Sequence, residues 1–200
     1  WGIIEVETEY EITTFSKVLS FELPSIRNGN VVILTISGGH GVICSDLCAR
    51  YGLKLVEFTE DEMKELQELL NPSAAPIASL RNPIDLTGSV VDRDVERVLE
   101  RLMEMDKVEA VILLMLPYPP TITMQLGRRA SNIARKYRKP VVAYVPWVQK
   151  YQMIVEGLEL NGVPVGHTVE EAVQMVKALK MKGEAEEKVR MRMTGEQTAP

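Results

Sequence analysis

A glycine-rich segment between two apolar stretches holds the residue types that most clearly allow chemistry. Ser37-Gly38-Gly39-His40-Gly41 follows the β-branched run Val31 to Ile36 and precedes a helical pattern from Val42 to Tyr51. Glycines permit a tight turn and a close approach of the backbone to a ligand. The first turn of a helix offers free N–H groups and the positive end of its dipole, so it attracts phosphate. We therefore predict a phosphate site formed by Gly38, Gly39, His40, Gly41 and Val42, supported by Ser37.

A purely structural turn is the alternative for this segment. Glycine-rich turns between strands and helices are common, and no lysine follows the glycines as in a Walker motif. The second predicted strand also lacks a terminal acidic residue that would bind a ribose. The glycines alone therefore do not distinguish a phosphate site from a structural turn.

His40 is the obvious reactive side chain, and the sequence holds two histidines. It could accept a phosphoryl group, act as a general base, donate a hydrogen bond to a bound anion, or be a loop residue without chemistry. His167 directly precedes Thr168, a predicted helix cap, and is interpreted as a loop residue.

A second motif reads Asn82-Pro83-Ile84-Asp85-Leu86-Thr87-Gly88. Pro83 forces Asn82 into an extended conformation. If the segment is a strand, Asp85 and Thr87 point to the same side, and the strand would end beside the glycine turn. Asn82, Asp85 and Thr87 are therefore predicted to support the phosphate site. The alternative is a loop in which these side chains only cap backbone groups.

Other reactive residues point to structure rather than to a site. Cys44 and Cys48 lie one helical turn apart, but no second Cys or His pair accompanies them, so we predict structural cysteines and no metal site. A basic cluster is interpreted as a solvated helix face, with an acidic cofactor or partner domain as the alternative. It comprises Arg128, Arg129, Arg135, Lys136, Arg138 and Lys139.

Predicted strands and helices alternate along the chain, which is the order that would place the glycine segment between a strand and a helix. Buried strands are predicted at 31–36, 110–116 and 141–145, with weaker ones at 53–56 and 163–165. Helices are predicted at 42–51, 59–70, 94–105, 122–137, 149–160 and 168–179. This order predicts an α/β doubly wound fold with about five parallel strands, which bind ligands at their carboxyl ends.

The two ends of the chain resemble each other. Aligning Thr8 with Thr168 superposes a short strand, a helix cap and an apolar helical face. We interpret 1–22 as the last strand–helix unit of a preceding domain, 23–30 as a linker, 31–182 as one domain and 183–200 as a mobile charged tail. Chance similarity of two such units is the alternative. Because the chain opens on Trp1 within a patterned segment, we expect a piece of something longer.

Composition excludes several classes of protein. The chain has 200 residues, 46% of them hydrophobic, and a net charge of −5. That balance predicts a globular domain rather than a non-specific nucleic-acid binder. No apolar run approaches the length of a membrane span, and two cysteines without a signal peptide favour the cytoplasm.

The order of a strand, SGGHGV, a helix, YGL, NPIDLTG, a buried strand and KPVVAYV resembles the acid–CoA ligases that form a nucleoside diphosphate. These are the ADP-forming acetyl-CoA synthetases, relatives of succinyl-CoA synthetase. The resemblance covers roughly residues 2–180 and is to one module, the second flavodoxin-like domain, which follows the phosphohistidine-bearing domain. It implies a five-stranded flavodoxin-like sheet.

The resemblance also implies a function. In that family acyl-CoA, ADP and phosphate interconvert with acid, CoA and ATP, and the phosphate passes through a histidine. Two helices point their N-termini at this phosphohistidine, and the turn Gly38 to Gly41 resembles one of them. CoA, ATP or ADP and Mg²⁺ would bind mainly to other domains. The implied partners are the preceding CoA-binding and phosphohistidine domains and an ATP-grasp domain or subunit, in an oligomeric enzyme.

The sequence departs from that family at one informative position. The family often has proline or a small residue where His40 stands, so His40 is not its phosphorylated histidine. No Ser-His-Thr-Gly segment occurs in this chain, so the isolated chain is expected to be inactive. Two alternatives remain: a non-catalytic interaction or regulatory module of a larger protein, and an autonomous enzyme that uses His40 as a phosphate acceptor.

Overall fold

A central parallel sheet organises the structure, a computed structural model that describes residues 2–194. Its strand order is β2-β1-β4-β5-β6, and β3 also pairs with β1. Every strand pair is parallel. The strands are β1 (Asn30–Thr35), β2 (Lys54–Leu55), β3 (Ile84–Asp85), β4 (Ala110–Leu114), β5 (Val141–Tyr144) and β6 (Val165–Gly166). The α/β doubly wound prediction is confirmed, with one short strand, β3, beyond the five expected.

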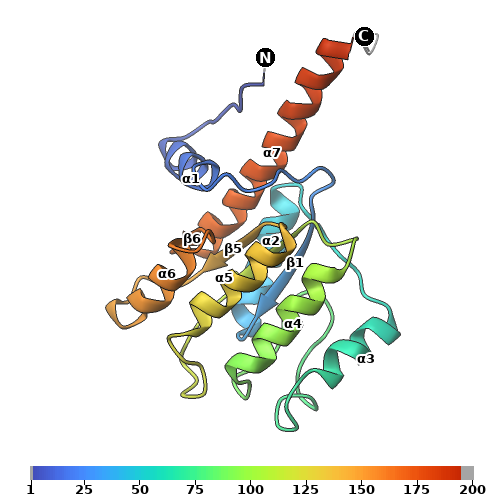
Figure 1. The fold of residues 1–200 in the computed structure, drawn as a ribbon, viewed down its shortest axis with the longest axis vertical. Coiled ribbons are helices and arrows are strands. Elements are labelled where there is room, and N and C mark those ends of the chain that lie inside the picture. The colour runs from blue at the N-terminus through green and yellow to red at the C-terminus, as the bar shows by residue number, and fades with distance from the viewer. Residues whose placement is uncertain (1, 195–200) are drawn as a thin grey trace.

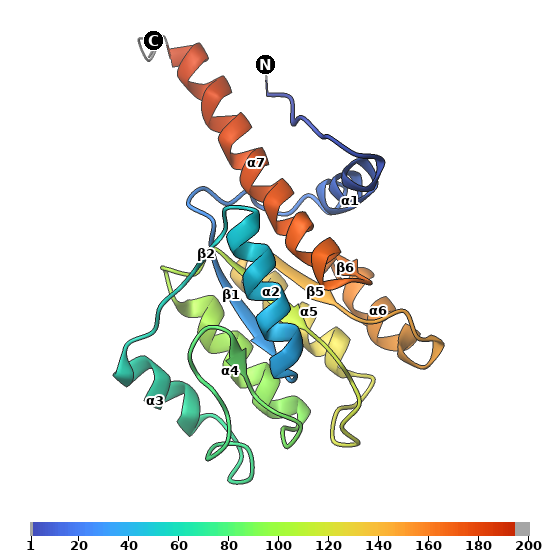
Figure 2. The ribbon, with the colours of Figure 1, turned by 180° about the vertical axis from the view of Figure 1, so that it is seen from behind.

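Helices cover both faces of this sheet. They are α1 (Glu9–Leu19), α2 (Gly38–Arg50), α3 (Glu60–Glu68), α4 (Asp92–Glu104), α5 (Leu126–Tyr137), the 3₁₀ turn η1 (Gln149–Tyr151), α6 (Gln152–Glu159) and α7 (Val169–Thr194). Figure 1 shows α4, α5 and α6 in front of the sheet. Figure 2, from behind, shows α2 and α7 on the opposite face, with α1 beside α7.

Strand residues alternate between two apolar clusters because successive side chains of a strand point to opposite faces. Val32 and Leu34 of β1 face the cluster that includes α4 and α5. Val31 and Ile33 face the cluster that includes α2 and α7. All four are essentially inaccessible to solvent, which explains why the strands read as continuous apolar runs.

The resemblance between the two chain ends has a structural counterpart in the helix caps. Thr8 Oγ1 accepts the Glu11 N–H at 3.1 Å, and Thr168 Oγ1 accepts the Glu171 N–H at 3.0 Å. The short strand expected before Thr8 is wrong, because residues 3–7 pair with no strand among the described residues.

Helix α1 packs against α7 through both apolar and charged side chains. Phe15 and Val18 are buried. Glu11 pairs with Lys177 of α7 at 2.8 Å, and Lys17 pairs with Glu159 at 2.8 Å. Buried side chains and ion pairs therefore hold α1 against α7 and α6.

Helix α7 continues through Thr194, although 183–200 was expected to be a mobile tail. Gly183 lets α7 lie close to the segment before β1, since a Cβ at position 183 would be 2.2 Å from the Ile26 carbonyl oxygen. Ser25 also donates to Glu186 at 2.6 Å. Residues 195–200 of the expected tail lie outside the described residues. No helix within residues 2–194 is long and apolar enough to cross a membrane.

Candidate functional site

The glycine segment forms the first turn of α2 instead of a loop before it. The helix begins at Gly38, four residues earlier than predicted, with Ser37 as its extended N-cap residue. The hydroxyl of Thr35 shapes the turn: it accepts the Ser37 N–H at 3.0 Å and donates to the Ser37 carbonyl at 3.1 Å. The end of β1 therefore leads directly into the helix.

The start of α2 leaves backbone donors free. Within the described residues, the Ser37 side chain makes no hydrogen bond that caps the helix. The N–H groups of Gly38, Gly39 and His40 precede the first intrahelical acceptor, while that of Gly41 donates to the Ser37 carbonyl at 3.1 Å. Gly38 and Gly39 are exposed, so three of the five predicted residues can offer an N–H to an outside anion.

Gly41 is required by packing rather than by ligand access. It is buried, and a Cβ at this position would lie 3.2 Å from both Pro83 Cβ and Thr35 Cγ2. Gly39 faces open space, with no atom within 4 Å of such a Cβ. The glycines thus divide into one that lets the helix approach the sheet and one that leaves the surface open.

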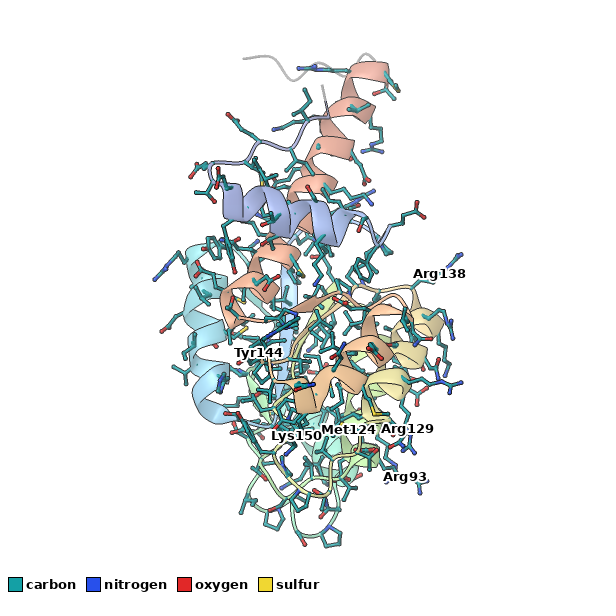
Figure 3. All side chains as sticks on the ribbon, turned by 90° about the vertical axis from the view of Figure 1, so that its left-hand side faces the viewer. Arg93, Met124, Arg129, Arg138, Tyr144 and Lys150 are labelled. Atoms are coloured by element: carbon teal, nitrogen blue, oxygen red, sulfur yellow. The ribbon has the colours of Figure 1, made fainter. Side chains whose placement is uncertain are left out.

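The imidazole of His40 is held over this turn by two contacts. Its Nδ1 lies 3.0 Å from Ser37 Oγ. Its ring stacks on Tyr144 with a centroid distance of 5.6 Å and an interplanar angle of 24°. Tyr144, labelled in Figure 3, projects from β5 toward α2. His40 is half-buried, so one edge of the ring remains accessible.

An open hollow of about 530 Å³ lies beside the turn. Its walls are aromatic, polar and small residues from the carboxyl ends of β1, β4 and β5. They include Ser37, His40, Gly88, Tyr118, Pro119 and Tyr144. Burial raises the pKa of Tyr144, so its hydroxyl stays protonated at neutral pH. Sequence reasoning missed Tyr118 and Tyr144, although both stand at or just after strand ends, where ligands bind in such sheets.

Of the second motif, Asp85 reaches the turn, and Thr87 contacts Asp85 rather than the turn itself. Asp85 ends β3, and its Oδ2 lies 2.8 Å from where a Cβ of Gly38 would be. Its Oδ1 accepts the N–H of Thr87 at 2.9 Å. Thr87 has φ +68°, an unfavourable conformation for a β-branched residue, which this hydrogen bond helps to hold.

Asn82 has a structural position instead. Its Oδ1 accepts the Ile33 N–H at 3.0 Å, and its Nδ2 donates to the carbonyls of Val31 at 2.9 Å and Val56 at 3.1 Å. The side-chain amide thereby fills the place where β1 changes neighbour from β2 to β3. Asn82 positions the motif without facing the hollow, which agrees with the capping alternative.

The remaining candidates lie away from the turn. Cys44 and Cys48 are free thiols fully buried against the sheet. His167 donates its backbone N–H to Glu171 and packs edge-on against Trp147 at a second hollow. In the basic cluster, Arg129 contacts Glu96 at 3.0 Å and Lys136 contacts Glu100 at 2.7 Å on an exposed surface. These pairs fit a solvated helix face.

Comparison with known proteins defines the class to which this fold and turn belong. The model of the Ligase-CoA domain family matches residues 31–181. The chain belongs to that family, and the resemblance seen in the sequence is confirmed.

Particular relatives are ADP-forming ligases. The chain is 28% identical over 183 residues to the alpha subunit of acetate–CoA ligase [ADP-forming] I of Pyrococcus furiosus, covering 89% of this chain and 38% of that one. It is 27% identical over 179 residues to 4-hydroxybutyrate–CoA ligase [ADP-forming] of Nitrosopumilus maritimus, covering 89% of this chain and 25% of that one. It thus spans well under half of these relatives.

Solved structures share the fold. A Pyrococcus horikoshii protein superposes with a TM-score of 0.81 and 26% identity, over 92% of this chain and 42% of that one. The acetyl-coenzyme A synthetase 1 of Ca. Korarchaeum cryptofilum, in complex with phosphate and ADP, superposes with a TM-score of 0.80 and 22% identity, over 99% of this chain and 41% of that one.

Proposed function

We propose that this chain is a domain of an ADP-forming acid–CoA ligase and that the start of α2 holds a phosphoryl group carried by the histidine of another domain. The observation that carries the proposal is the exposed first turn of α2, whose amides of Gly38, Gly39 and His40 lack a side-chain cap. Preorganised N–H donors stabilise negative charge without reorganising during the reaction. Membership of the Ligase-CoA domain family supports this use of the turn.

The neighbouring carboxylate defines which side of the turn would receive the anion. Asp85 lies against Gly38, so its negative charge repels a phosphoryl group there. The amides of Gly39 and His40 lie farther along the turn and border the open side. We therefore place the phosphoryl oxygens at Gly39 and His40, on the side of the turn away from Asp85.

Exposed apolar side chains near the turn support a protein as the carrier of the phosphate. Val42 and Ile43, directly after the first turn of α2, are 62% and 52% exposed. Tyr118, which follows β4 and lines the hollow beside the turn, is also exposed. Apolar surface of this kind marks protein–protein contact. The proposed partners are the preceding CoA-binding and phosphohistidine domains, which the unit 1–22 would close, and an ATP-grasp domain or subunit in an oligomeric, cytoplasmic enzyme.

Under this proposal the chain supplies phosphate stabilisation and little else of the reaction. CoA, ADP or ATP and Mg²⁺ would bind to the other domains, and the histidine that carries the phosphate lies outside this chain. Glycine at position 39 keeps the donors accessible, because no neighbouring atom covers it.

Two measurements test the proposal. In the 200-residue chain, millimolar sulfate or phosphate should shift the amide NMR signals of Gly39 and His40 more than those of the N-terminus of α4. In an enzyme reassembled with its partner domains, Gly39→Val should abolish phosphorylation of the partner histidine. Ala49→Val, at an exposed position farther along α2, is the control for introducing a valine on the surface of this helix.

The proposal fails if the turn amides ignore the anion, or if the Gly39→Val enzyme phosphorylates its histidine at the parent rate. Normal acid- and CoA-dependent ADP turnover in that variant would favour the non-catalytic interaction module instead.

A further inference from the structure

His40 is the one histidine among the described residues that line the hollow at the start of α2. Imidazole is the side chain type that serves most often as a ligand sensitive to neutral pH. Ser37 Oγ occupies the Nδ1 of His40, and Tyr144 covers one face of the ring. Its Nε2 has no hydrogen-bond partner within the described residues. The ring is thus fixed in place with one nitrogen left for a ligand.

We propose that His40 is a titratable ligand of the anion held at this turn, so that the domain binds a dianionic phosphoryl group more tightly when the imidazole is protonated. This inference rests on the proposed function and adds to it a residue that controls affinity. It is carried by the 530 Å³ hollow and its ring cluster, in which the imidazole shares the wall with Tyr118 and Tyr144.

The charges around His40 favour this role. The ionisable groups that face the hollow or the turn are Asp85 from β3, Tyr118 from the segment after β4 and Tyr144 from β5. Burial raises the pKa of Tyr144, so this tyrosine is neutral at physiological pH. Asp85 lies against Gly38, and its carboxylate would repel a phosphate there. A protonated His40 would offset that repulsion at the far side of the turn.

Binding and protonation are then linked reciprocally. If the protonated imidazole attracts a dianion, the dianion must raise the pH at which His40 titrates. An opposite charge within about 4–6 Å typically moves a titration by 1 unit or more. A movement of 1 unit corresponds to a tenfold difference in affinity between the two charge states of His40.

Sulfate is the probe, because it remains a dianion across the range in which histidine titrates, whereas phosphate itself takes up a proton there. Imidazole C–H signals of His40 and His167 are followed by NMR from about pH 5 to about pH 8.5 with and without sulfate. We expect the His40 midpoint to rise by about 1 unit. His167 is the internal control, since its Nδ1 lies 3.1 Å from the Val145 carbonyl at a different hollow.

The variant His40→Asn separates this inference from the proposed function. Its amides at Gly39 and at position 40 should still respond to sulfate, but the parent's roughly tenfold gain in affinity on acidification should disappear. Ser37→Ala, which frees the ring from its Nδ1 contact, should reduce that gain while keeping the imidazole.

The outcomes are distinct. Amide shifts at the turn without any movement of the His40 midpoint, or equal pH dependence in His40→Asn and parent, would overturn the role of His40 and leave the anion site intact. Absence of amide shifts in the parent would overturn both.

Discussion

The most informative perturbation of the fold beneath the site is Asn82→Ala, because one side chain joins three backbone segments. The substitution removes the acceptor of the Ile33 N–H and both hydrogen bonds from Nδ2. The Val31 carbonyl keeps a second donor, the Val56 N–H at 3.0 Å. The Ile33 N–H loses the Asn82 Oδ1 acceptor at 3.0 Å.

These contacts give a magnitude for the loss. A buried donor left unpaired costs about 1–3 kcal/mol, and each lost hydrogen bond contributes about 0.5–1.5 kcal/mol. Because these terms overlap, we expect the free energy of unfolding to fall by about 2–4 kcal/mol. For a domain of this size each kcal/mol lowers the Tm by about 2–4 °C, so the Tm should fall by about 4–16 °C.

Thermal unfolding followed by far-UV circular dichroism, with urea unfolding as a second measure, tests this prediction. Asn132→Ala is the matched control: Asn132 is an exposed residue of α5, and its change should stay within about 0.5 kcal/mol. An Asn82→Ala Tm within about 2 °C of the parent would refute the idea that this amide joins β1 to its two neighbours.

Three further changes have defined outcomes. Gly39→Ala, in open space, should keep or slightly raise the Tm, whereas Gly183→Ala, with a Cβ only 2.2 Å from the Ile26 carbonyl oxygen, should lower stability by about 1–3 kcal/mol in the same thermal assay. Asp85→Asn should tighten sulfate binding several-fold by NMR titration, because it removes the anion beside the turn; weaker binding would contradict the placement of the phosphoryl group. Glu109→Gln should cost about 1–2 kcal/mol in urea unfolding at neutral pH. Burial alone would raise the pKa of Glu109, but the N–H groups of residues 27, 28 and 30 hold it below its ordinary value. This stabilisation is present above the ordinary pKa and is lost as the pH falls through the lowered one, so the difference between variant and parent should shrink in acid.

The sequence predicted the sheet well because its main strands are buried on both faces and read as apolar runs. It missed β3 as a definite strand, because only Ile84 and Asp85 pair with β1 and a proline precedes them. It placed the start of α2 four residues late, since glycine is a poor helix former. Packing of Gly41 against Thr35 and Pro83 overrides that preference.

At the site, too, features set by neighbouring residues could be predicted from the sequence, whereas contacts between distant residues could not. The donors of the turn follow from local sequence, because a helix start has free amides wherever it occurs. The partners of His40 do not, since Tyr144 lies more than a hundred residues away and is brought to it only by the order of β1, β4 and β5. Likewise the contact of Gly183 with Ile26 extends α7 beyond the point where its apolar pattern ends.

The uncapped start of α2 sets a limit on engineering for heat resistance. A helix N-cap such as aspartate ordinarily adds about 0.5–2 kcal/mol, and Ser37 makes no such bond. Ser37→Asp would therefore be an attractive stabilising substitution on purely thermodynamic grounds. Its carboxylate would, however, accept hydrogen bonds from the same amides that the proposed anion needs. The substitution would therefore raise thermal stability while competing with anion binding.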